Sequence, residues 1–542
     1  MENKKLNLPV GIQRFEQIRK GGYIYVDKTK YLVEMIRKGK IYFLARPRRF
    51  GKSVIASTFE AIFAGEKELF KGLYAEKFMM DFEPSPVISL DMSKVATHRG
   101  IDELEASICH KVNKIANSLQ VSLSNTLSSG DLLDDLISTT FEKYNQHVVV
   151  LIDEYDSPYV EFVNETTMAD NVRNVLRGFY KQLKANEKYI RFIFITGISK
   201  FARLGVFSAL NNINDISLKT DYSEICGLTE EEIIKYFPDY LAETAKSMNI
   251  STDELIEKMR YYYNGFSFDY DAKTRLYNPF STLEFFDNKR FLNYWIDTGK
   301  PKIIADFMKN KNLTVEQFRN FPISRDFARS PGDVDETPPE GFLYQAGYLT
   351  LRPGIAGSLT LDYPNTEVLK SMSKLLTQNI ITQNYNLFEN KLLSAIISND
   401  VKKFIECANY ILSCIPYDDF NNAAKQSVEL TGNKLTVQEW LYRSCIIAFL
   451  RGCGIVTFAE VQTNVGRSDI MLSHQGFIWL IELKVAAKDE SAKSKAEEAY
   501  RQIEEKYAKA YPDALWVGLA IEDEKREITE YKMKVEKNGK TI

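Results

Sequence analysis

Two acidic residues and a lysine near the C-terminus have the types and spacing of a metal-dependent hydrolytic centre. Asp469 ends the run Gly466–Asp469, and Glu482 and Lys484 follow it in the string Ile-Glu-Leu-Lys. Side chains 482 and 484 share one face of a strand, because strand side chains repeat every two residues. Two carboxylates form a hard-oxygen site suited to Mg²⁺, and a lysine beside them steadies a hydroxide or a phosphate. The three side chains predict a phosphodiester-cleaving centre.

The apolar run Phe477–Ile481 just before Glu482 strengthens this interpretation, because a charge placed in a buried strand needs a partner or a role. An Asp followed by Glu-x-Lys also arises by chance in a chain in which 26% of the residues are charged. The alternative is a simple ion pair between Glu482 and Lys484 at a strand end.

A second set of residues has the pattern of a phosphate-binding loop. The expected strand Ile41–Ala45 runs into Arg-Pro-Arg-Arg-Phe-Gly-Lys-Ser, in which Gly51, Lys52 and Ser53 match the end of a Walker A motif. Arg46 stands where that motif has its first glycine, so the match is partial. Seven basic residues and no acidic one lie between positions 37 and 52, which independently indicates an anion site. The alternative is a solvated basic loop.

The second half of such a site is an apolar strand that ends in acidic residues, and Val148–Asp153 has this form. Asp153 is expected to hold Mg²⁺ through water, and Glu154 to polarise the attacking water. After a further strand, Phe192–Thr196, either Thr196 or Ser199 is a candidate γ-phosphate sensor. Arg203 is a candidate arginine finger, acting in cis or from a neighbouring copy.

The elements that position these residues follow from apolar periodicity. Strands alternate with helical stretches over the first ~220 residues, which predicts a parallel α/β sheet. The expected strands are Ile41–Ala45, Val87–Asp91, Val148–Asp153 and Phe192–Thr196, and the expected helices include Ser53–Phe63 and Ile101–Leu119. Helical patterns dominate after Thr229. The last ~110 residues have the length of an ordinary domain, and their pattern predicts a second, compact α/β unit. Its elements are a helix over Val437–Leu450, strands over Ile455–Thr463, Asp469–Ser473 and Phe477–Val485, a helix over Ala492–Ala510, and strands over Leu515–Ile521 and Ile528–Val535.

Bulk properties narrow the class of protein. A chain of 542 residues is too long for one core, and a net charge of −3 means that any anion-binding surface is local. The six cysteines form no Cys-x-x-Cys pair, which disfavours structural zinc and disulfides and favours a reducing compartment. No apolar span of ~20 residues and no signal core occurs, so we expect a soluble, cytoplasmic protein without membrane segments.

Four strings together resemble the bacterial AAA-ATPase-like family, whose members typically end in a PD-(D/E)XK nuclease superfamily domain. They are Tyr25–Thr29, Arg46–Ser53, Ile152–Asp156 and Thr196–Lys200. The resemblance covers nearly the whole chain. It implies a P-loop NTPase parallel sheet with a helical lid and a C-terminal PD-(D/E)XK nuclease-like α/β domain. The implied segments are residues 1–225 (P-loop domain), 226–328 (helical lid), 329–412 (linker and small middle α+β module) and 413–542 (nuclease-like domain).

The resemblance also implies roles for individual residues. In the nuclease-like domain, Asp469 and Glu482 become metal ligands and Lys484 orients water or phosphate. Glu439 on the preceding helix matches an additional acid of many members, and Gln502 on the following helix matches an accessory polar residue. Ser468 replaces the proline of the motif's name. In the P-loop domain the nucleotide and its Mg²⁺ are assigned to Arg49, Gly51, Lys52, Ser53 and Asp153, and water activation to Glu154.

The leading hypothesis is an ATP-binding domain that controls a Mg²⁺-dependent nuclease acting on DNA, with ATP and Mg²⁺ as cofactors. A homo-oligomer through the ATPase domain is compatible with it. A second hypothesis is an ATP-dependent sensor or binding protein whose nuclease fold is catalytically inactive. A third is a plain nucleotide hydrolase with a structural tail.

Overall fold

The structure is a computed structural model in which the chain forms two compact units. It describes residues 5–96, 100–124, 128–162, 165–198, 212–295, 318–324, 327, 339–354, 357–380, 385–414, 434–463, 466–474, 476–507 and 509–534. The N-terminal unit comprises Met1–Gly299 and Phe318–Val368, and the C-terminal unit comprises Lys300–Gln317 and Leu369–Ile542. The division at Val368 lies inside the segment 329–412 expected from sequence as a middle module. The four-segment division stays a prediction.

The N-terminal unit is built on the predicted parallel sheet, in the strand order β2-β3-β4-β1-β5. Its strands are β1 (Ile41–Ala45), β2 (Val87–Asp91), β3 (Val148–Asp153), β4 (Ile190–Gly197) and β5 (Asn214–Asp215). The first three have the expected ends, and β4 is longer than expected. Residues 41–45 are all buried, as parallel strands covered on both faces are. The α/β fold class is therefore confirmed.

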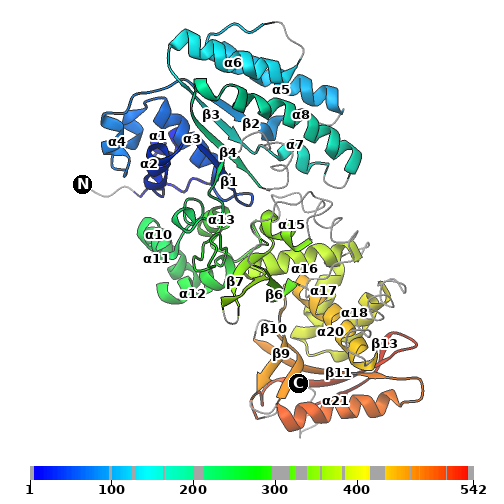
Figure 1. The fold of residues 1–542 in the computed structure, drawn as a ribbon. Helices are drawn as coiled ribbons and strands as arrows, with labels where there is room; N and C mark the ends of the chain where they lie inside the picture. The colour runs from blue at the N-terminus through cyan, green and yellow to red at the C-terminus, as the bar shows by residue number, and fades with distance from the viewer. Residues whose placement is uncertain are drawn as a thin grey trace. The chain divides into compact units, whose positions relative to one another are not determined.

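Helices cover this sheet and leave its carboxyl edge to loops. Helix α3 (Lys52–Phe63) contacts β2, β3 and β4, and the bundle of α5 (Ile101–Ser118), α6 (Ser129–Tyr144) and α8 (Thr166–Ala185) lies along the sheet (Figure 1). The carboxyl ends of parallel strands meet at one edge, where open α/β sheets bind their ligands. The loops that follow β1, β3 and β4 therefore share that edge.

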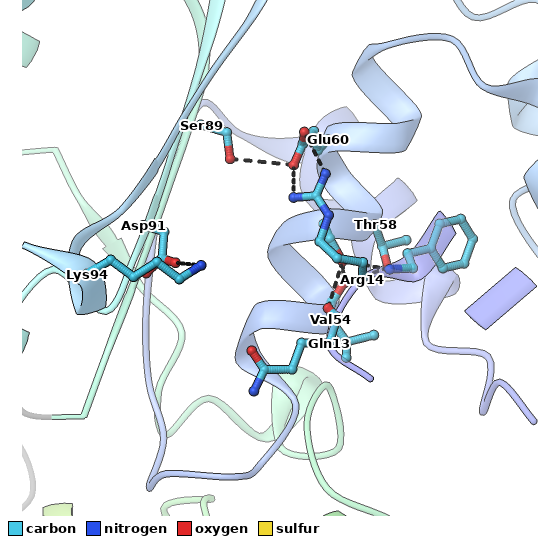
Figure 2. Close-up of polar contacts among 10 residues, drawn as sticks. Gln13, Arg14, Val54, Thr58, Glu60, Ser89, Asp91 and Lys94 are labelled. Carbon is cyan, nitrogen blue, oxygen red and sulfur yellow. Dashed lines mark hydrogen bonds and ion pairs between the residues drawn. The ribbon is translucent and has the colours of Figure 1, made fainter. Parts of the chain in front are cut away.

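The N-terminal arm is fastened to helix α3 (Figure 2). Arg14 makes two bonds to the Glu60 carboxylate, at 2.9 and 3.0 Å. The Phe15 amide donates to Ser57 Oγ at 3.0 Å, and that hydroxyl contacts the Gln13 carbonyl at 3.3 Å. The arm thus runs beside the helix that begins at the expected phosphate loop.

A helical region follows the sheet within the same unit. It contains α10 (Glu230–Tyr236), α11 (Pro238–Met248), α12 (Thr252–Tyr263) and α13 (Pro279–Asn288), as the helical periodicity after Thr229 predicts. Thr229 and Glu232 form a capping box at the start of α10. The Glu232 carboxylate also binds Lys28 Nζ at 2.5 and 2.7 Å. The lysine of the Tyr25–Thr29 string therefore anchors the helical region. A small antiparallel sheet completes the unit with β6 (Phe321–Ile323), β7 (Thr350–Pro353) and β8 (Leu359–Asp362).

The C-terminal unit has a mixed five-stranded sheet in the order β13-β12-β11-β10-β9. Only β11 and β12 are parallel. Every helix and strand predicted for this region is present: α20 (Lys434–Gly452), β9 (Val456–Thr463), β10 (Gly466–His474), β11 (Phe477–Ala486), α21 (Ala492–Lys506), β12 (Leu515–Glu522) and β13 (Glu527–Met533). They are preceded by α17 (Tyr385–Ile397) and α18 (Val401–Cys414).

The two faces of this sheet have different cores. Trp479, Ile481 and Leu483 of β11 join one large apolar cluster with residues of α17, α18 and α20. Leu480, between them, packs with Ile503 and Tyr507 on the α21 side. The even-numbered residues of β11 therefore face α21, and Glu482 and Lys484 lie on this face. Among the helices in the described ranges, none is long and apolar enough to cross a membrane.

Candidate active sites in the two units

The acidic centre of the C-terminal unit lies where two strands part. The ladder between β10 and β11 runs from His474↔Phe477 to Ile470↔Ile481 and stops there. The next residues on the two strands are Asp469 and Glu482. Side chains in opposite positions of an antiparallel pair stand on the same face with Cβ atoms about 5 Å apart. The sheet therefore brings these two carboxylates together.

Side-chain bonds replace the ladder beyond that point. The Leu483 amide donates to Asp469 Oδ2 at 2.9 Å, and the Asp469 amide donates to Glu482 Oε2 at 3.2 Å. Each carboxylate thus has one oxygen held by the backbone of the opposite strand. Because backbone amides fix them, the carboxylates keep their positions relative to each other without help from exposed side chains.

Burial and mutual repulsion make the pair electrostatically unfavourable. Glu482 is only 1% exposed. Burial first, and the nearby Asp469 charge second, raise the pKa of the Glu482 carboxyl well above its ordinary value. A cation placed between the carboxylates would offset both costs, so the geometry suits a cation site.

Lys484 and Glu439 form a second pair at the same strand. Glu439 Oε1 accepts from the Val485 amide at 3.2 Å, and Glu439 Oε2 lies 3.9 Å from Lys484 Nζ. Burial raises the pKa of the Glu439 carboxyl, and the Lys484 charge offsets part of that rise. Glu439 therefore restrains the ammonium group beside the carboxylate pair. Glu482 Oε1 accepts a hydrogen bond from the side-chain amide of Gln502 on α21.

A glycine that the sequence analysis passed over allows this last contact. Gly518 on β12 lies beside Glu482 in the strand register. A Cβ at Gly518 would come within 2.5 Å of the Ala496 carbonyl and the Tyr500 amide, both backbone atoms of α21. The missing side chain therefore lets α21 approach the sheet closely enough for Gln502 to reach the site.

We expect Gly518→Ala to destabilise the C-terminal unit by about 2–3 kcal/mol, because helix backbone must move to admit the methyl group. Thermal unfolding measures the loss. Gly178→Ala is the matched control, since a Cβ there meets nothing within 4 Å and Gly178 lies in helix α8. It should raise stability by a few tenths to about 1 kcal/mol. Equal losses in both variants would contradict the close-approach argument.

The sequence analysis also missed Arg443, which lies one helical turn beyond Glu439 on α20. Its Nη1 donates to Asp469 Oδ1 at 2.8 Å. Residues four apart share one face of a helix, so Glu439 and Arg443 together line the point where the strands part. The spacing of four residues between Glu439 and Arg443 was the one sequence signal for this role. An acid and a base at that spacing usually form an exposed ion pair on a helix, so the signal is weak.

The donor set fits magnesium better than zinc or calcium. No group of three or more His, Cys, Asp or Glu side chains able to hold a metal ion occurs in the described part of the chain. Magnesium is bound through one or two carboxylates and keeps several waters, whereas calcium takes six to eight oxygens and structural zinc about four protein ligands. The two carboxylates of Asp469 and Glu482 would meet the requirement for magnesium.

In the N-terminal unit, the loop after β1 has the backbone of an anion site. Arg49 and Gly51 both adopt left-handed conformations, with φ of 65° and 92°. Alternating right- and left-handed residues turn successive amides inward as an anion-binding nest. Gly51 caps the N-terminus of α3, whose dipole also favours anions. A Cβ at Gly51 meets nothing within 4 Å, so its backbone conformation, rather than space, requires glycine.

Lys52 lies across this loop. Its Nζ donates to the carbonyls of Arg46 and Pro47, both at 3.0 Å, and the side chain is buried. Ser53 follows it at the start of α3 and is half-buried. Arg49 is exposed at the loop, with its guanidinium 4.8 Å from the centre of the Phe280 ring. Lys52 and Ser53 thus begin the helix directly after the loop.

Arg46, at the position of the missing glycine, does not face an anion. It is 1% exposed, and its guanidinium donates to the carbonyls of Ala45, Ser217 and Tyr222. The group also lies 4.4 Å from the centre of the Phe268 ring. The basic run between positions 37 and 52 therefore overstates the charge available to a phosphate. Arg46 instead ties the end of β1 to the segment after β5 and to the helical region.

The acidic strand end lies at the same edge of the sheet. Thr196 Oγ1 of β4 donates to Asp153 Oδ1, and the Glu154 amide donates to that same oxygen at 3.1 Å. Burial raises the pKa of the Glu154 carboxyl, and the Lys52 charge offsets part of the rise. Glu154 has a left-handed φ of 51°. The structure thus brings together Lys52, Asp153, Glu154 and Thr196. Ser199 and Arg203 lie outside the described residues, as do residues 329–338 of the segment expected as linker and middle module.

Comparison with known proteins gives a family match in each unit. Residues 9–207 match the family described as "Predicted AAA-ATPase", and residues 437–530 match one described as "PD-(D/E)XK nuclease superfamily". An uncharacterised protein in the vnfD 5′ region of Azotobacter chroococcum mcd 1 is 30% identical over 519 residues, which cover 94% of each chain.

Two archaeal structures resemble the chain weakly. The Aeropyrum pernix Orc1 protein in complex with DNA is 12% identical, with a TM-score of 0.26, over 64% of this chain and 91% of its own. Cdc6p from Pyrobaculum aerophilum is 11% identical, with a TM-score of 0.21, over 68% of this chain and 96% of its own. Scores this low add nothing to the assignment of a site. The match along almost the whole of the Azotobacter chain and the two matched segments show that the chain belongs to the AAA-ATPase-like family with a C-terminal domain of the PD-(D/E)XK nuclease superfamily.

Proposed function

We propose that the chain is an ATP-controlled, Mg²⁺-dependent nuclease that hydrolyses phosphodiester bonds of DNA. The observation that carries the proposal is the carboxylate pair Asp469 and Glu482, fixed by backbone amides where β10 and β11 part, with Lys484 on the same face of β11. A buried pair of like charges destabilises the fold. A cation bound between the two carboxylates would offset that cost.

Asp469 and Glu482 would hold the magnesium ion, which when bound lowers the pKa of a coordinated water and offsets charge on the phosphate. Lys484, restrained by Glu439, would align the attacking hydroxide or a phosphate oxygen. The attacking water would lose a proton to solvent, its oxygen would bond to phosphorus as the bond to the leaving oxygen breaks, and the leaving oxygen would take a proton from solvent. Gln502 keeps Glu482 oriented from the α21 side.

In the N-terminal unit, Gly51, Lys52 and Ser53 would hold the phosphates of ATP, with Asp153 and Ser53 toward its Mg²⁺. Glu154 would polarise the attacking water, and Arg49 would contact the nucleotide from the exposed side of the loop. Binding requires Lys52 to exchange two loop carbonyls for phosphate oxygens. That exchange gives the nucleotide a way to change the shape of the loop, as switching in nucleotide-binding proteins requires.

The function is tested by incubating the full chain with Mg²⁺ or Mn²⁺ and linear, single-stranded and branched DNA, with matching RNA as comparison. Metal-dependent cleavage of DNA supports the proposal. Cleavage of RNA alone would contradict the substrate. ATP-dependent DNA binding without any cleavage would favour the second candidate, a sensor with an inactive nuclease fold. The ion pair between Arg443 and Asp469 favours that candidate, because it neutralises the charge of a proposed metal ligand.

Control by ATP makes a separate prediction for Lys52→Ala. The variant should bind ATP about 100-fold more weakly, because the side chain supplies a charge-assisted contact to the phosphates. DNA cleavage should lose its response to ATP. Isothermal titration and cleavage with and without ATP measure the two effects. Lys40→Ala is the control, since Lys40 Nζ donates to the Glu187 carbonyl at the opposite end of β1. If Lys52→Ala left both nucleotide affinity and cleavage unchanged, control by ATP would be wrong.

A further inference from the structure

Arg443 occupies one of the two oxygens of Asp469. Its Nη1 donates to Oδ1 at 2.8 Å, while the Leu483 amide donates to Oδ2 at 2.9 Å. Both charged side chains are largely buried, with 16% of Arg443 and 19% of Asp469 exposed. The bond to Oδ2 belongs to the backbone and moves only with the strand. Oδ1 is therefore the oxygen of Asp469 whose partner can be exchanged by a side-chain rotation.

We propose that Arg443 is a positioning residue that alternates with the divalent cation on Asp469 Oδ1 and, when displaced, binds a phosphate oxygen of DNA. The inference rests on the proposed function. A guanidinium binds carboxylate and phosphate oxygens in the same planar, forked geometry. A cation shared by Asp469 and Glu482 repels the guanidinium, and an arriving phosphate offers it a new anionic partner. Metal and DNA thereby bind in a linked manner.

The position of Arg443 on α20 supports exchange. Glu439, one turn earlier, is anchored to the Val485 amide, so this face of the helix is fixed against β11. Arg451 on the same helix shows the contrasting arrangement. Its Nε and Nη2 both donate to the Thr457 carbonyl, and the side chain is 6% exposed. Arg451 bonds a backbone oxygen that no cation competes for, whereas Arg443 bonds an oxygen of a predicted metal ligand.

The test measures Mn²⁺ binding to the full chain without nucleotide, by the electron paramagnetic resonance of free Mn²⁺. Arg443→Gln should bind Mn²⁺ about fivefold more tightly, because a competing positive charge has been removed. Its affinity for DNA, measured with metal present, should fall about tenfold. Arg443→Lys keeps the charge and should restore Mn²⁺ affinity to the wild-type value. Arg501→Gln is the control, because Arg501 is exposed and bonds only a carbonyl of its own helix in the described contacts.

Opposite changes in metal and DNA affinity support the proposal, since a merely structural role would weaken both. Unchanged or weaker Mn²⁺ binding by Arg443→Gln, with unaltered thermal unfolding, would overturn it. The proposed function fails in a different way. In that case Asp469→Asn does not lower the Mn²⁺ binding of the wild type, because no Mn²⁺ binds at Asp469.

Discussion

Asp469→Asn is expected to lower metal-dependent DNA cleavage by about a thousandfold or more, because it removes one of two carboxylates that would share the cation. Glu482→Gln should have the same effect, and the double variant should be little worse than either single one, since the two side chains act as a unit. Initial cleavage rates at saturating Mg²⁺ measure these losses. Asp489→Asn is the control, because Asp489 is exposed and follows β11 without reaching the site.

Stability separates this result from simple misfolding. Burial and the Asp469 charge raise the pKa of Glu482 above its value in an unfolded chain. Its charged form therefore opposes folding, and the cost grows as pH rises through the folded-state pKa. Glu482→Gln should stay within about 1 kcal/mol of the wild-type stability at neutral pH, because the relief of the buried charge offsets the loss of one hydrogen bond, from an N–H donor that the glutamine NH2 cannot accept. Loss of activity without loss of stability is the expected signature. Activity retained in either variant would contradict the carboxylate pair as the metal site.

Strands β1, β3, β4, β11 and β12 followed from apolar periodicity because their residues are largely buried. β1, β2 and β3 have the ends that the sequence predicts, since each apolar run is bounded by polar residues or proline. The position of Asp469 opposite Glu482 also followed, because a hairpin of two strands fixes the register of its side chains. Local pattern was sufficient wherever the partner lay on a neighbouring strand.

Contacts between residues distant in sequence could not be predicted in the same way. Arg443 and Asp469 are brought together by the packing of α20 against the sheet, and apolar periodicity does not predict that packing. Gly518 looked like an ordinary strand residue, and its role depends on how closely α21 approaches. The loop that begins at Arg46 was interpreted from its partial Walker A match and its charge, although tertiary carbonyls decide where that charge lies.

The loop itself is shaped by partners outside it. The Trp295 indole donates to the Arg48 carbonyl at 3.2 Å, and the Gly227 amide donates to the Phe50 carbonyl at 3.2 Å. The Phe50 ring packs edge-on against Phe268, with centroids 5.1 Å apart. These contacts and the buried guanidinium of Arg46 hold the loop in its conformation from outside. With the consensus glycine, the loop's own backbone would determine that conformation.

Arg46→Gly, which restores the consensus Walker A glycine, is therefore expected to weaken rather than improve the protein. It removes hydrogen bonds from a charged donor to three carbonyls, of which the Tyr222 carbonyl keeps a bond from the Ile225 amide. It also opens a cavity against Phe268. Burial lowers the pKa of Arg46, so relief of a buried charge returns part of the loss. We expect a net destabilisation of about 4 kcal/mol, measured by denaturant unfolding.

Arg49→Gly in the same loop is the matched control for Arg46→Gly. Arg49 is exposed and has a left-handed φ of 65°, a conformation that glycine adopts without strain. Its replacement should leave stability within about 1 kcal/mol of the wild type. A loss of equal size in both variants would mean that any change in this loop is disruptive. A stable Arg46→Gly variant with tighter ATP binding would show that the buried arginine only occupies the place of the glycine. The predicted contrast follows because one arginine bonds the fold and the other faces solvent.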